Sequence, residues 1–136
     1  MINILLETRF GVTGNALDWF ASYLKGRTQS VVINGRASDA SEILYGVPQG
    51  SVLGPILFTL YCAPLEDILN KYAVDFMMYA DDTQVYITCD KSKHTKDVLE
   101  ACIAEIRDWM FNIKLVLNDS KTEVINIHSS FNRNYC

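Results

Sequence analysis

The sequence predicts an α+β fold in which helices cover one face of an antiparallel sheet with a hairpin at its centre. Helical and strand-like patterns are mixed along the chain, and a candidate hairpin lies near its middle. The composition is that of a globular protein, because 49% of the 136 residues are hydrophobic and 21% are charged. A chain of this length is expected to form one domain with a core of its own.

The N-terminal part is expected to form one helix and one hairpin. The helix covers residues 15–25 and ends at Gly26. Residues 28–33 are rich in strand formers, Asn34-Gly35 is a strong hairpin-turn signal, and residues 42–45 are expected to form the returning strand. The helix is indicated by apolar residues spaced along one face: Leu17, Phe20, Ala21 and Leu24.

A loop and a second helix are expected next. The loop covers residues 46–50 and contains Pro48. Ser51 is a suitable N-cap, and Pro55 suits the first turn of the helix. The helix should reach about residue 70 and bend near Pro64, because proline removes a backbone donor and crowds the preceding turn.

The C-terminal part is expected to contain a hairpin, a long helix and a last strand. The hairpin strands cover residues 74–79 and 83–88 and flank a turn at Ala80-Asp81-Asp82, since aspartate tolerates unusual turn angles. A turn at residues 118–120 separates the helix from a strand over residues 122–128. From about residue 95 the helix shows one apolar face: Leu99, Cys102, Ile103, Ile106, Met110 and Ile113.

The sequence argues against several classes of protein. The longest apolar stretch, residues 52–65, is interrupted by glycine and proline and is shorter than the roughly 18 residues of a membrane span, so no membrane partner is expected. The N-terminus lacks the basic region of a secretory signal, and the four scattered cysteines include no C-x-x-C pair for zinc. An intracellular location is therefore expected, with nucleus and cytoplasm both open.

Charge argues against a self-sufficient nucleic-acid binder. Sixteen acidic and twelve basic residues give a net charge of −4, whereas domains that grip nucleic acid by themselves are usually basic. Two modest basic groups are interpreted as solvated surface, namely Lys25, Arg27 and Arg36 in one and Lys91, Lys93 and Lys96 in the other. Trp19 and Trp109 lie beside apolar helical stripes and are expected in the core.

The most informative feature is the acidic pair Asp81-Asp82 at the predicted hairpin tip. Adjacent carboxylates repel each other unless water or a cation offsets their charge. Magnesium prefers carboxylate oxygens together with substrate phosphates, and paired metals can stabilise phosphoryl transfer. The alternative is that two aspartates simply favour an exposed turn.

Four blocks together identify a family. In chain order they are Tyr23-Leu24-Lys25-Gly26-Arg27-Thr28-Gln29, Gly46-Val47-Pro48-Gln49-Gly50-Ser51, Tyr79-Ala80-Asp81-Asp82, and Leu117-Asn118-Asp119-Ser120-Lys121-Thr122-Glu123-Val124. In these blocks the chain resembles the reverse transcriptase domain of non-LTR (LINE-type) retrotransposons. The resemblance extends to about His128 and implies part of the palm of a right-hand polymerase, with the acidic hairpin at the centre of the palm sheet.

The resemblance implies RNA-directed DNA polymerisation by two magnesium ions. A primer 3′-hydroxyl would attack a deoxynucleoside triphosphate, and the partners would be an RNA template, a DNA primer and the nucleotide. Asp81 matches a direct metal ligand, and Asp82 matches its partner carboxylate. Such a reaction needs little from the protein beyond positioning and charge neutralisation.

The resemblance also implies roles outside the acidic pair. Pro48, Gln49 and Gly50 match the block that touches the template strand and the incoming nucleotide. Lys121 matches a lysine near the leaving pyrophosphate, where it would act as general acid or counter-charge. The alternatives are an ordinary Pro-Gly loop before a helix and a solvated lysine beside a turn.

The family pattern is incomplete in this chain. Its metal site uses a third carboxylate, which would fall a few residues before Met1, and its fingers lie mostly upstream and its thumb downstream. Residues 1–136 are therefore expected to be a partial reverse transcriptase domain with an incomplete two-ion site, inactive as an isolated fragment. The alternatives are a non-catalytic remnant, a domesticated interaction domain, and a weak nucleic-acid-binding module.

Overall fold

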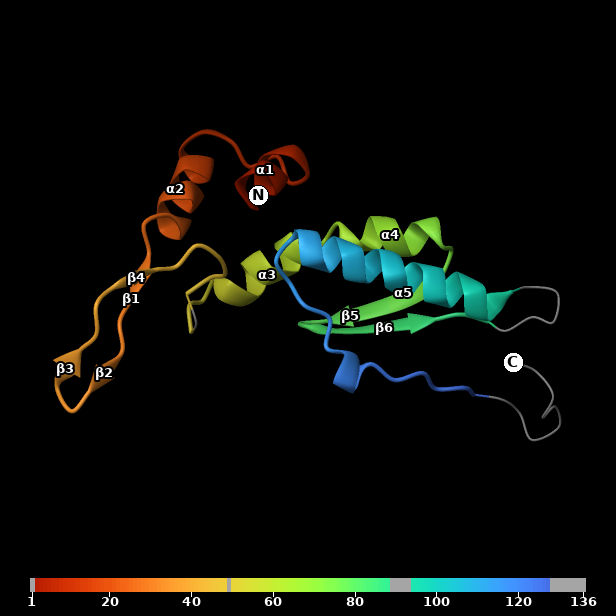
Figure 1. The fold of residues 1–136 in the computed structure, drawn as a ribbon. Helices are drawn as coiled ribbons and strands as arrows, with labels where there is room; N and C mark the ends of the chain where they lie inside the picture. The colour runs from red at the N-terminus through yellow and green to blue at the C-terminus, as the bar shows by residue number, and fades with distance from the viewer. Residues whose placement is uncertain (1, 49, 89–93, 128–136) are drawn as a thin grey trace. The chain divides into compact units, whose positions relative to one another are not determined.

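The computed structural model describes residues 2–48, 50–88 and 94–127 as helices and three two-stranded antiparallel sheets (Figure 1). The mixture of helices and antiparallel strands confirms the predicted α+β class. The expectation of one sheet is wrong for the described residues, because each strand pairs with only one partner. The chain divides into two compact units, Met1–Cys62 and Ala63–Cys136.

The first unit begins with two helices. Helix α1 (Ile2–Thr8) buries Leu6 completely and contacts α2 and α3, although it is too short to give a clear helical period in the sequence. Helix α2 (Gly14–Leu24) confirms the predicted helix to within one residue at each end. Trp19 of α2 was expected in the core, but its side chain is 51% exposed. It stacks on the ring of Tyr23, and no residue of α2 is fully buried.

A narrow hairpin arm follows α2 and confirms the predicted turn at Asn34-Gly35. Strand β2 (Val32–Ile33) pairs with β3 (Arg36–Ala37), and β1 (Thr28–Gln29) pairs with β4 (Ser41–Glu42). The prediction of the returning strand is wrong in extent. Pairing already begins at residue 36, and residues 43–45 lie outside any strand.

The predicted helix up to residue 70 is two helices, not one bent helix. Helix α3 (Gly54–Cys62) ends before Pro64, and α4 (Leu65–Lys71) begins after it, with Pro64 as N-cap at a φ of −65°. Proline suits the start of a helix because it needs no hydrogen-bonded N–H there. Ser51 does not cap α3, since the helix begins three residues later, whereas Pro55 lies in its first turn as predicted.

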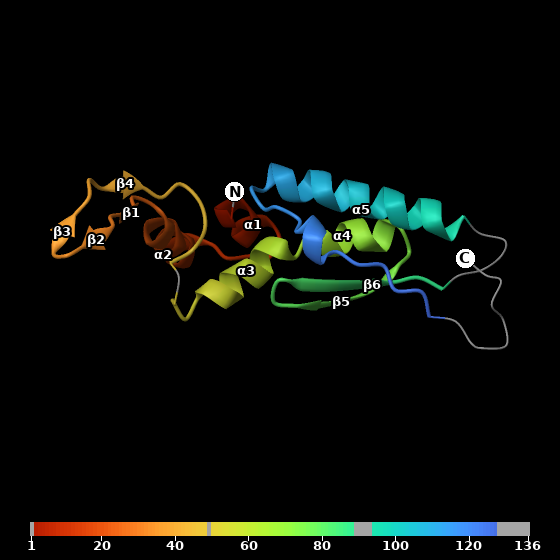
Figure 2. The same ribbon diagram turned by 60° about the horizontal axis from the view of Figure 1, so that its bottom comes forward.

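The second unit has its own core. Strands β5 (Asp75–Tyr79) and β6 (Asp82–Tyr86) form a hairpin, and α4 and α5 (Thr95–Asn112) lie on the same face of it (Figures 1 and 2). For this hairpin, the arrangement confirms the prediction that helices cover one face of the sheet. Its core combines residues from α4, α5 and the segment before β5, namely Leu65, Ile68, Leu69, Val74, Cys102 and Ile106.

Helix α5 confirms the predicted apolar face and ends in a well-formed C-terminal motif. Cys102, Ile106 and Ile113 are buried, and Trp109 packs against the core as expected. Lys114 takes a positive φ of 63°, and the N–H of Leu115 donates to the carbonyl of Met110 at 2.8 Å. These features form a Schellman motif, which satisfies carbonyl groups at the end of the helix.

The last strand predicted from the sequence is absent from the described residues. Asp119–Lys121 forms a short 3₁₀ helix, η1, which agrees with the predicted turn. Residues 122–127 then form no strand, and His128 lies outside the described residues. Val124 and Ile127 are exposed, so their strand propensity finds no partner strand to pair with.

None of the helices in the described ranges combines the length and the apolar character that a bilayer-spanning helix requires.

Candidate functional site

The acidic pair lies at the tip of the β5–β6 hairpin. Tyr79 pairs with Asp82 across the two strands, so the turn consists of Ala80 and Asp81 alone. Asp82 is therefore the first residue of β6, whereas the sequence had predicted that it belongs to the turn. The positive φ of the turn, 53°, falls on Ala80 and not on an aspartate. Glycine usually occupies such a position, because a positive φ strains other residues by about 1 kcal/mol or more.

Strand alternation gives the hairpin two different faces. Phe76, Met78 and Val85 point toward the core formed with α4 and α5. Asp82 lies on the opposite face together with Tyr79, because side chains of cross-strand partners share a face. We call this opposite face the outer face, and it consists of Asp75, Met77, Tyr79, Asp82, Gln84 and Tyr86.

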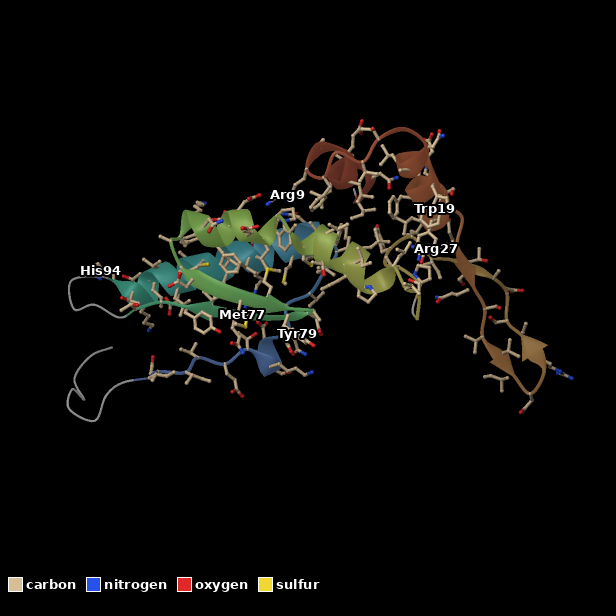
Figure 3. All side chains as sticks on the ribbon, turned by 180° about the vertical axis from the view of Figure 1, so that it is seen from behind. Arg9, Trp19, Arg27, Met77, Tyr79 and His94 are labelled. Carbon is tan, nitrogen blue, oxygen red and sulfur yellow. The ribbon has the colours of Figure 1, made fainter. Side chains whose placement is uncertain are left out.

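The outer face is open. Tyr79 is 80% and Met77 is 59% exposed, and both lie on the side of the hairpin away from α4 and α5 (Figure 3). The hydroxyl of Tyr86 donates to Oε1 of Gln84 at 2.5 Å, which holds two polar groups of the face in place. An extended ligand therefore has access to the face that carries Asp82.

The chemistry of the donor set fits a divalent cation in part. Asp81 and Asp82 are adjacent, exposed carboxylates. Magnesium typically takes one or two protein carboxylates and completes its shell with water and substrate phosphates. In the described part of the chain, no group of three or more acidic, histidine or cysteine side chains is placed to hold a metal.

Lys121 belongs to the same unit as the acidic pair. It ends the 3₁₀ helix η1, where its N–H donates to the carbonyl of Asn118 at 3.1 Å. Arg107 of α5 holds this turn, because its Nη2 lies 2.6 Å from Oδ1 of Asp119. In Figure 1 the turn lies toward the same end of the unit as the hairpin tip. Arg107 was not singled out from the sequence.

The other predicted site residues belong to the first unit. Pro48 is half-buried and Gly50 is exposed, whereas Gln49 lies outside the described residues. Gly50 has a φ of 78°, and a Cβ added there would meet nothing within 4 Å. The glycine is therefore required by the backbone conformation and not by close packing within the chain.

Backbone hydrogen bonds join this loop to α3. The N–H of Ser51 donates to the carbonyl of Pro48 at 3.2 Å, and the N–H of Gly54 donates to the carbonyl of Ser51 at 3.2 Å. A Cβ on Gly54 would lie 3.3 Å from Oγ of Ser51, so the helix start and the loop are in close contact. These contacts hold the C-terminal end of the loop that contains Pro48 and Gly50.

Arg27 is a functional candidate that the sequence analysis assigned to solvated surface. Its side chain is half-buried, and its Nε donates to the carbonyl of Leu24 at 3.0 Å. Its Nη2 donates to the carbonyl of Gly46 at 2.6 Å and to that of Tyr45 at 3.4 Å. Its place just after the end of α2 was a usable signal, because arginines there often bond the last helical carbonyls.

Comparison with known proteins gives a consistent result. Residues 3–132 match the family model described as reverse transcriptase (RNA-dependent DNA polymerase). The chain is 30% identical over 105 residues to the RNA-directed DNA polymerase from mobile element jockey of Drosophila melanogaster, and 32% identical over 108 residues to that of Drosophila funebris. It is 30% identical over 103 residues to the probable RNA-directed DNA polymerase from transposon X-element of Drosophila melanogaster.

These matches cover most of the chain but little of the relatives. Each includes 74% of this chain, but only 12% of the two jockey polymerases and 11% of the X-element polymerase. No solved structure matches the chain.

Proposed function

This chain belongs to the reverse transcriptase (RNA-dependent DNA polymerase) family, and from that premise we propose that it forms part of the palm of a retrotransposon polymerase. The observation that carries the proposal is the acidic pair at the tip of a hairpin whose outer face is open. A polymerase palm needs such a surface, because a template–primer duplex is a large ligand that must reach the carboxylates.

The proposed reaction is nucleotidyl transfer on an RNA template. The 3′-oxygen of a DNA primer bonds to the α-phosphorus of a deoxynucleoside triphosphate, the bond from this phosphorus to the leaving pyrophosphate breaks, and the primer hydroxyl gives its proton to water. Asp81 and Asp82 are the proposed ligands of a divalent metal, for which we favour Mg²⁺. When bound, the metal neutralises charge on the phosphates and polarises the reacting oxygens.

The remaining site residues have positioning roles in this proposal. Lys121 supplies positive charge for the leaving pyrophosphate, and Arg107 supports it through Asp119. Pro48, Gln49 and Gly50 approach the template base and the incoming nucleotide. Gly50 suits this role, because glycine has no side chain to come between its backbone and a ligand, and, its chain neighbours apart, no atom of the chain lies within 4 Å of the place of a Cβ.

The first test compares carboxylates of the same hairpin. Asp81→Asn and Asp82→Asn remove the proposed ligands. Asp75→Asn removes the same charge at the start of β5, about 13 Å along the strand from Tyr79, the residue that pairs with Asp82. Binding of Mn²⁺ is followed by electron paramagnetic resonance, and DNA synthesis by primer extension on an RNA template with Mg²⁺. We expect Asp81→Asn to weaken Mn²⁺ binding about 10-fold or more and any extension about 100-fold or more.

Equal behaviour of the Asp81 and Asp75 variants in both assays would contradict the proposed metal site. Mn²⁺ binding that depends on Asp81, without extension by this chain, locates the metal site here and assigns catalysis to a longer polypeptide. If neither Mn²⁺ nor nucleotide binds, the chain is a non-catalytic remnant or an interaction domain. Weak nucleic-acid binding in that case would be recognised by its steep decrease with salt.

A further inference from the structure

Arg27 connects two segments that are far apart in the sequence. Its guanidinium donates from Nε to the carbonyl of Leu24, at the end of α2, and from Nη2 to the carbonyls of Tyr45 and Gly46. Its own carbonyl accepts the N–H of Ile43 at 2.8 Å. Figure 3 places Arg27 beside the end of α2 and the chain segment that leads to α3.

Apolar burial does little to hold residues 44–46 in place. Leu44 is 68% and Tyr45 is 63% exposed, although both are large apolar side chains. Gly46 follows with a φ of 77°, so the backbone turns at the residue whose carbonyl Arg27 binds most closely. The hydrogen bonds of Arg27 therefore restrain the backbone at Tyr45 and Gly46, where apolar burial does little.

The loop that carries Pro48 and Gly50 is thus held at both ends. Arg27 holds Gly46, and the backbone bonds of Ser51 and Gly54 hold the other end against α3. Only Val47 separates Gly46 from Pro48, and proline allows little rotation about φ. We therefore expect a change at the Gly46 carbonyl to alter the position of Pro48.

We propose that Arg27 is a positioning residue that sets the backbone at Gly46 and Pro48 for the incoming deoxynucleoside triphosphate. This inference rests on the proposed function, because it assumes that the loop approaches the nucleotide. The planar guanidinium is needed, since it donates in two directions at once from Nε and Nη2. A lysine has one nitrogen and does not reach carbonyls on both sides with the same geometry.

The first part of the test measures the loop itself. Arg27→Met and Arg27→Lys are compared with Arg36→Met, which removes an exposed arginine of β3 in the same unit. Hydrogen exchange of the Ile43 and Ser51 amides, which donate to the carbonyls of Arg27 and Pro48, should become about 10-fold faster in both Arg27 variants, because the charged hydrogen bonds that hold the loop are lost. Exchange over residues 63–88 and 94–127 should remain as in the unmodified chain. If Arg27→Lys keeps the loop protected, the fork-shaped contact is not what holds it, and the inference is overturned.

The second part measures nucleotide affinity. A fluorescent deoxynucleoside triphosphate is titrated in the presence of Mg²⁺ and a template–primer duplex, and template–primer affinity is measured separately. We expect the nucleotide Kd to rise about 10-fold in both Arg27 variants and to stay unchanged in Arg36→Met, with template–primer affinity unchanged throughout. A looser loop with an unchanged nucleotide Kd overturns the inference and leaves the proposed function standing. No nucleotide binding by the unmodified chain overturns the inference, and it overturns the proposed function as well if Mn²⁺ does not bind either.

Discussion

Ala80 is the residue at which the hairpin tip departs from the usual turn chemistry. Its φ of 53° places an L-residue in a region that glycine adopts freely. Ala80 immediately precedes Asp81 and Asp82, so the strained residue lies next to the proposed metal ligands. Strained residues persist where the surrounding structure holds them, and here the β5–β6 pairing does so.

Ala80→Gly should therefore stabilise the second unit, by about 0.5–1 kcal/mol, because relief of strain exceeds the added entropy of the unfolded chain. The control is Ala101→Gly, an exposed site within α5, which should destabilise by about 1 kcal/mol. Urea unfolding followed by Trp109 fluorescence, in a Trp19→Phe background, measures both. Equal destabilisation by the two glycines would show that Ala80 carries no strain.

Residues near each other in the sequence were predictable, whereas distant contacts were not. The acidic pair and its turn could be located from Tyr79-Ala80-Asp81-Asp82. The strand boundaries were less accurate, because β5 begins at residue 75 and not 74, and β6 covers residues 82–86 and not 83–88. The role of Arg27 was missed because its partner carbonyl at Gly46 lies 19 residues away. No local pattern reports such a contact, and a basic residue in a loop is usually solvated.

At the scale of elements, a polar cluster joins α4 to α5. Oε2 of Glu105 accepts hydrogen bonds from Nζ of Lys71 at 2.5 Å and from the hydroxyl of Tyr72 at 2.7 Å. Hydrogen bonds from Lys71 and then Tyr72 lower the pKa of Glu105. The bond to Glu105 raises the pKa of Lys71 and that of Tyr72.

These shifts predict how stability depends on pH. The folded-state pKa of Glu105 lies below its unfolded value, so its contribution is present above the unfolded pKa and is lost as pH falls through the folded one. Lys71 acts in the opposite direction, and its contribution is lost as pH rises through its raised pKa. Glu105→Gln should flatten the acid-side decrease in the stability of the second unit, measured by urea unfolding between about pH 5 and pH 2. An unchanged acid slope would mean that the cluster contributes nothing to folding.

The predicted boundaries of helices and strands were wrong where contacts with distant parts of the chain decide them. Residues 122–127 have strand formers at Val124 and Ile125, but a strand needs a partner, and the described residues offer none to this segment. The expected bend at Pro64 is a complete break between α3 and α4. The long helix α5 was predicted well, because 18 residues display its apolar period several times over.

At the scale of the whole molecule, each unit contains fully buried leucines of its own. Leu57 of α3 is 2% exposed in the first unit, and Leu69 of α4 is 0% exposed in the second. The division of the chain into two compact units falls at Cys62 and Ala63, next to the proline that separates the helices.

We therefore expect the two units to unfold in separate transitions. Leu69→Ala should destabilise the second unit by about 2–5 kcal/mol, because it leaves a cavity beside Cys102 and Ile106, and should leave the first unit unaffected. Leu57→Ala is the matched substitution and should have the opposite selectivity. Trp109 and Trp19 report on the two units, each observed with the other replaced by phenylalanine. If either leucine substitution shifts both urea transitions equally, the chain folds as one cooperative domain. Separate transitions would instead show that each unit is stabilised by its own core.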